Sequence, residues 1–157
     1  MEDNAVVRRI YVEKKAGFDV EAKKVYSDIK ENLSLTGLTD VRLIQRYDVE
    51  GIDDAEYEKA RELIFSEPPV DNAYDETIEI SEGKSFAVEY LPGQFDQRAA
   101  SAAECISILT QEDAPKVRSA MVYVLIGDVS DEELEKAKKY LINPVEAREA
   151  SQDKPAS

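Results

Sequence analysis

Residues 18–22 read FDVEA, and residues 95–99 read FDQRA. In both segments an aspartate precedes an amphipathic stretch, where its side chain is suited to cap a helix. The same offset of 77 positions maps EKAR at 58–61 onto EKAK at 135–138. Capping and buried positions therefore coincide in two pairs of predicted helices, which is the pattern of an internal repeat.

Strands and helices are predicted to alternate around these segments. Residues 6–14, 41–49 and 120–126 favour strands because they are rich in β-branched and aromatic side chains. The last of these is the most apolar and is expected to be central. Residues 77–80 and 86–91 are expected to pair as a hairpin.

Four helices are predicted from their caps and apolar spacing. The expected caps are Asp19, Asp53 or Asp54, Asp96, and Ser130 or Asp131. The second helix is expected to bury Tyr57, Ala60, Leu63 and Ile64. The offset of 77 predicts equivalent buried sites for Ala22 and Ala99, and for Ala60 and Ala137.

The resulting fold class is α+β, built from two tandem β-α-β-α repeats. We expect residues 1–82 and 83–150 to form the two copies and residues 151–157 to form a linker. Each copy alone is too short to bury much apolar surface. The copies are therefore expected to pack as a pseudo-two-fold, two-layer sandwich with mainly antiparallel sheet and helices on one face of each half.

Composition excludes several classes of protein. The 157 residues include no histidine and one cysteine, so the chain by itself forms no histidine-based triad, imidazole metal site or intrachain disulfide. A net charge of −14 disfavours nucleic acid and anionic membranes as partners. The acidic start, residues 1–4, is unlike a secretory signal. A cytoplasmic location is expected.

Candidate chemistry is sparse. Residues 48–82 contain thirteen acidic residues, which are interpreted as a solvated face rather than a metal site or a surface for a basic partner. Cys105 is expected to be a partly buried structural residue, because no histidine is present to activate it. No glycine-rich phosphate loop is present, so no catalytic, cofactor-binding or metal-binding residue is assigned.

One turn, residues 92–98, carries more polar groups than a helix cap needs. It is interpreted either as a capped turn or as a site for an anion or a partner carboxylate, because it leads into a helix N-terminus. The small residues 99–103 beside it favour tight packing or an external contact. The candidate interdomain contacts are Gly93, Gln94, Asp96, Gln97 and Arg98.

Several motifs resemble one enzyme family. They are VRRIYVEKK at 7–15 followed by GFD at 17–19, RYDVEG at 46–51, FSEPPVD at 65–71, EYLPGQFDQRA at 89–99 and NPVE at 143–146. Together they resemble the N-terminal, PurS-like domain of the large single-chain phosphoribosylformylglycinamidine synthase. The resemblance spans nearly the whole chain, and residues 91–99 are its most specific part. Ala100 departs from the acidic residue expected in that family.

The resemblance implies a role in purine biosynthesis. The parent enzyme would be a ligase with a glutamine amidotransferase domain, and it would use ATP, Mg²⁺ and glutamine-derived ammonia to amidate formylglycinamide ribonucleotide. Neither its synthetase domain nor its glutaminase domain is matched by these residues. The chain would then be a non-catalytic fragment without a cofactor of its own, a structural bridge whose partners are those two domains.

Two other functions fit the sequence. A free-standing adaptor subunit would make the same bridge in trans. A regulatory domain would bind a small metabolite between the repeats, and it predicts a polar-lined pocket at the pseudo-two-fold axis.

Overall fold

A computed structural model of the chain describes residues 6–155. The elements follow in the order β1 (Val7–Lys14), α1 (Val20–Asn32), β2 (Leu38–Glu50), α2 (Asp54–Ala60), η2 (Arg61–Phe65), β3 (Asp71–Asp75), β4 (Lys84–Tyr90), α3 (Gln97–Thr110), β5 (Lys116–Gly127), α4 (Asp131–Leu141) and β6 (Ala147–Ala150). Within residues 6–155, no helix has the length and apolar character needed to cross a membrane.

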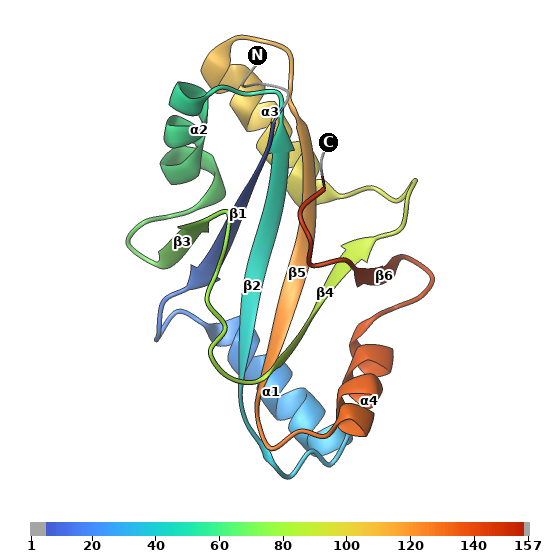
Figure 1. Cartoon of the computed structure of the whole chain (residues 1–157). Helices are drawn as coiled ribbons and strands as arrows, with labels where there is room; N and C mark the ends of the chain where they lie inside the picture. Colours follow the sequence, from blue (N-terminus) through green and yellow to red (C-terminus); the bar gives the residue numbers. More distant parts are fainter. Residues whose placement is uncertain (1–5, 156–157) are drawn as a thin grey trace.

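The six strands form one antiparallel sheet in the order β3-β1-β2-β5-β4-β6. The helices cover one face of it, here called the helical face, so the α+β class and the antiparallel sheet are confirmed. Helices α2 and α3 pack over one end of the long strands, and α1 and α4 pack over the other end (Figure 1). The middle of the helical face lies between these two helix pairs.

Strand pairing in residues 84–150 follows that in residues 7–75. Ile10 pairs with Tyr47, and Phe86, 76 positions after Ile10, pairs with Tyr123, which is 76 positions after Tyr47. Tyr11 pairs with Tyr74 in the same way that Ala87 pairs with Ala150. The strands of the two halves therefore correspond at an offset of 76.

The helix caps keep the predicted offset of 77. Asp53 and Ser130 each make a capping box, and Asp96 caps α3 77 positions after Asp19. A uniform offset of 77 is wrong for the strands, because it would match Tyr47, on the helical face, with Val124, on the opposite face.

The predicted hairpin is wrong. Residues 77–80 form no strand, and β4 pairs with β5 and β6 instead. The segment carrying Ile78 and Ile80 crosses the face opposite the helices, here called the open face, and packs on Val122 and its neighbours (Figure 1). Ala22, Ala99, Ala60 and Ala137 are all buried, as expected.

The second helix departs from its predicted pattern. After α2 the chain continues as the π-helix η2, whose wider turns change the helical period. Leu63 is therefore 70 % exposed rather than buried, and Phe65 enters the core in its place. Tyr57 and Ala60, which precede the π-helix, are buried as predicted.

The segment predicted as a linker makes specific contacts through residue 154. The Arg9 guanidinium donates to the carbonyl of Gln152 at 2.8 Å, and Arg46 donates to the carbonyl of Ser151 at 2.9 Å. Lys154 forms an ion pair with Glu76. Residues 151–154 are thus attached to the open face, while 156–157 lie outside the described residues.

Candidate functional site

The turn singled out in the sequence joins β4 to α3. Gly93 has φ +91°, a backbone conformation that glycine adopts readily and other residues rarely do. The amide of Gln94 donates to the carbonyl of Leu91 at 3.0 Å. Gly93 and Gln94 are exposed and contribute the shape of the turn.

Asp96 is engaged within the chain. Its carboxylate accepts from the amide of Ala99 at 3.0 Å, which caps α3, and from the hydroxyl and amide of Ser119 on β5. These bonds fix the start of α3 to the sheet. The sequence predicted the cap. No local sequence pattern, however, indicates the hydrogen bonds between Asp96 and Ser119.

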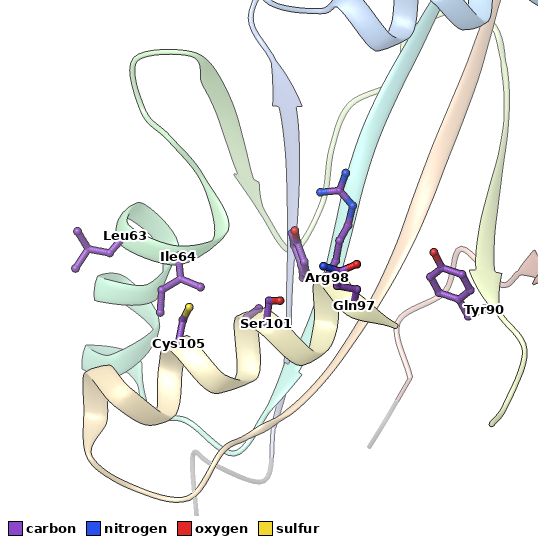
Figure 2. A pocket seen from close by; sticks show the side chains of 9 residues that line it. Leu63, Ile64, Tyr90, Gln97, Arg98, Ser101 and Cys105 are labelled. Carbon is purple, nitrogen blue, oxygen red and sulfur yellow. The ribbon is translucent and has the colours of Figure 1, made fainter. Parts of the chain in front are cut away.

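Gln97 and Arg98 lie on the first turn of α3 and line a groove of about 540 Å³ between α3, η2 and β4. Figure 2 shows Ser101 and Cys105 farther along α3, with Leu63 and Ile64 on η2 and Tyr90 on β4. Cys105 is exposed, so the expectation of partial burial is wrong. The groove is partly polar, and its wall on η2 is apolar.

Two further hollows adjoin Arg98 in the middle of the helical face. One, of about 380 Å³, extends toward β1 and the segment after η2, and the other, of about 230 Å³, extends toward β4 and β6. Gln45 and Met121, which pair with each other in the β2–β5 ladder, line both hollows. Arg98 is the residue that connects all three spaces.

Electrostatics distinguish the groove from most of the surface. Arg98 is the one charged residue among those that line it, in a chain of net charge −14. Tyr47, also on its wall, is 8 % exposed, and burial raises the pKa of its phenol while the nearby Arg98 acts in the opposite direction. The groove thus offers a guanidinium and hydroxyl groups without a competing carboxylate.

Sequence reasoning missed the far side of the groove. Tyr47 was assigned to a strand, and Leu63 to a buried helix face, without a site role. The alternation of apolar residues in β2 places Tyr47 on the helical face, but nothing local shows that Arg98 lies above it. We identify no sequence pattern in residues 61–65 that predicts the π-helix, which turns Leu63 outward.

Six of the thirteen acidic residues in the stretch 48–82 form ion pairs with bases of the same chain. Asp48 binds Arg9, Asp71 lies 3.0 Å from the ammonium of Lys14, and Asp75 binds Arg61 at 2.8 Å. Within residues 6–155, no group of three or more carboxylates or thiols is arranged to hold a metal ion. Much of this stretch therefore contributes to the fold through ion pairs.

No protein-family model and no curated protein matches this sequence.

Proposed function

We propose that this chain is the N-terminal bridging domain of a phosphoribosylformylglycinamidine synthase. In this proposal residues 1–82 and 83–150 are tandem PurS-like copies related by a pseudo-two-fold axis. The domain itself performs no chemistry. It positions a synthetase domain, which would use ATP and Mg²⁺, relative to a glutaminase domain.

The resemblance of residues 89–99 and of the other quoted motifs supports the family assignment. The offset of 76 between paired strands, together with the sheet order β3-β1-β2-β5-β4-β6, supports the duplication. A two-fold axis perpendicular to the sheet would pass through the pair Gln45–Met121, which are themselves 76 positions apart.

The observation that carries the bridging role is the groove around Arg98. The side chains of Gln97 and Arg98 are exposed, whereas Asp96 is engaged by Ala99 and Ser119. In this proposal Arg98 donates hydrogen bonds to a carboxylate of the rest of the enzyme. An apolar side chain of the same partner packs on the exposed Leu63 beside it. Leu63 and Arg98 come from different elements, so the fold is needed to present them together.

The test is Arg98→Glu in the full-length enzyme and in the isolated chain. Charge reversal at a docked ion pair costs on the order of a few kcal/mol in docking. We therefore expect impaired synthesis with glutamine in the full-length variant. Assays with ammonia in place of glutamine show whether domain coupling or the synthetase is affected. Full activity with glutamine would rule out this docking role.

The isolated chain provides the matched control. Because Arg98 is exposed, Arg98→Glu should leave its melting temperature within a few degrees, since such changes are usually worth about 0.5 kcal/mol or less. Unfolding of the variant would show that Arg98 is needed for folding.

The native chain length separates the domain from a free-standing adaptor, since further coding sequence after Ser157 would exclude the adaptor.

A separate observation supports a second candidate function, that of a regulatory domain that binds a metabolite. The hollows of about 380 and 230 Å³ flank Gln45 and Met121, where a metabolite-binding regulatory domain would place its ligand. Calorimetry against purine intermediates and amino acids separates the two functions. Saturable binding that is lost in Gln45→Ala but retained in Leu63→Ala would favour regulation over bridging.

A further inference from the structure

A second polar cavity lies on the open face, opposite the helices and away from the Arg98 groove. It has a volume of about 140 Å³. The arginines Arg9, Arg46 and Arg118 line it, and the segment after β6 passes beside them. This cavity is not used by the bridging role proposed above.

Arg46 is the distinctive member of the cavity. It is 5 % exposed, and in the described part of the chain its guanidinium has one hydrogen bond, to the carbonyl of Ser151, and no carboxylate within ion-pair distance. Burying a cation without a counter-ion is costly. The pKa of Arg46 is lowered, first by burial and then by the charge of Arg9.

Arg118 reaches the same cavity from the neighbouring strand. Arg46 pairs with Ala120 in the β2–β5 ladder, so Arg118, two residues away on the same face, is its diagonal neighbour. Arg118 is exposed and likewise makes no ion pair within residues 6–155. Two guanidinium groups without counter-ions therefore flank one small polar space.

The three carboxylates that line the cavity do not cancel this charge. Asp48 is held by both nitrogens of the Arg9 fork, at 2.7 and 2.9 Å, and Glu89 accepts from Arg148 at 2.8 Å. Asp153 remains, on the exposed segment after β6. Of the three carboxylates, only the exposed Asp153 is therefore left to balance Arg46 and Arg118.

We propose that this cavity is a binding site for one oxyanion of phosphate size, held by Arg46 and Arg118. A planar guanidinium group can donate two parallel hydrogen bonds to two oxygens of one phosphate. A space flanked by two such groups therefore suits this ligand. The ligand is free phosphate or the terminal phosphate of a small ester. Asp153 competes with the ligand as the anion supplied by the chain itself.

The strongly negative net charge of the chain makes phosphate binding an informative test of this site. A protein of charge −14 repels anions in general, so saturable phosphate binding requires a local cationic site. The probes are inorganic phosphate and glycerol phosphate, each titrated into the full chain in the calorimeter against sodium chloride of equal ionic strength. Tighter binding of one probe identifies whether the free ion or the ester is the preferred source.

Four variants, one of them a control, test this proposal. Arg118→Gln should weaken phosphate binding about tenfold, whereas Lys24→Gln, which removes an exposed cation on α1 outside the cavity lining, should change it less than twofold. Asp153→Asn should strengthen binding several-fold. Arg46→Met should abolish binding. If that variant does not fold, the exposed position Arg118 still decides the outcome. Phosphate binding no better than chloride, or equal losses in Arg118→Gln and Lys24→Gln, would overturn the proposal.

Discussion

Gln45 lies directly opposite Met121 in the central ladder of the sheet, and the two residues are 76 positions apart. The amide nitrogen of the Gln45 side chain donates to the carbonyl of Ala120 at 2.9 Å, across the same strand pair. The two side chains also line both hollows beneath Arg98. They lie between the two helix pairs, where no helix within residues 6–155 covers the sheet.

The helices on either side of this centre provide a paired packing test. Ala60 and Ala137 are fully buried in different clusters of the core. Leucine at either site overpacks the helix–sheet contact, so Ala60→Leu and Ala137→Leu should each lower the free energy of unfolding by about 1–3 kcal/mol. Urea denaturation measures both.

Ala100→Leu is the control for that pair, because residue 100 is exposed on α3. It should change stability by about 0.5 kcal/mol or less. A loss as large as at the buried alanines would contradict the assignment of the penalty to overpacking, because leucine and alanine have similar helix propensities.

The two aspartates that begin α1 and α3 should behave differently. Asp96 caps α3 and also binds Ser119, whereas Asp19 makes no side-chain bond to its own helix start. Asp96→Ala should therefore cost about 1–2 kcal/mol, and Asp19→Ala about 0.5 kcal/mol or less. Chemical denaturation of both variants provides the measurement, and equal costs would contradict this reading of Asp96.

Local signals explain which elements were predicted. Four strands, including β4 at the predicted 86–91, and four helix starts were found because runs of β-branched and aromatic residues and capping residues act within a few positions. β3 reads DNAYD, whose Asp and Asn are depleted in strands, and it exists because it pairs with the edge of β1. Ile78 and Ile80 alternate like a strand, but their apolar surface covers the open face.

The candidate sites were predictable only in part. The polar turn indicated Arg98, but the groove requires η2, whose π-helical turn depends on packing beyond the local sequence. Arg46 and Arg118 are 72 positions apart in the sequence, and only the β2–β5 register brings them to one cavity. Contacts of this separation leave no trace in a single segment.

The buried pair Arg9–Asp48 should dominate stability on the open face. Arg9 is 2 % exposed, and both of its bonds to Asp48 are shorter than 3 Å. Arg9→Met leaves Asp48 buried without its partner, which should cost about 3–5 kcal/mol in unfolding free energy. Arg148→Met, which breaks an exposed pair with Glu89, should cost about 1 kcal/mol or less. Similar denaturation midpoints for the two variants would contradict this assignment.

Catalysis by the chain alone is not expected. Cys105 is exposed on α3, but the sequence offers no imidazole to activate it and no glycine-rich loop to hold ATP. The purified chain should release neither ammonia from glutamine nor phosphate from ATP above a buffer blank. Glutamine hydrolysis that disappears in Cys105→Ala would show that the thiol is a nucleophile after all.

Acid should act on the contact of Asp75 with Arg61 and Tyr57. Partial burial opposes ionisation of Asp75, but hydrogen bonds from Arg61 and Tyr57 favour it and leave its pKa below the ordinary value of 3.8. A carboxyl with a lowered pKa in the folded state stabilises the fold above its ordinary pKa, and this contribution is lost as the pH falls through the lower, folded value.

Asp75→Asn isolates this effect, because asparagine keeps the shape of the side chain without its titration. At pH 7 the variant should be less stable than the parent chain, since it lacks the charged bonds to Arg61 and Tyr57. The difference should shrink as the pH falls from about 5 to about 2, because the parent then loses the same charge. Urea midpoints measured across that range supply the comparison. The side chain of Asp75 is 47 % exposed, so solvent screening keeps the effect small. A difference that stays constant with pH would show that Asp75 does not contribute through its ionised form.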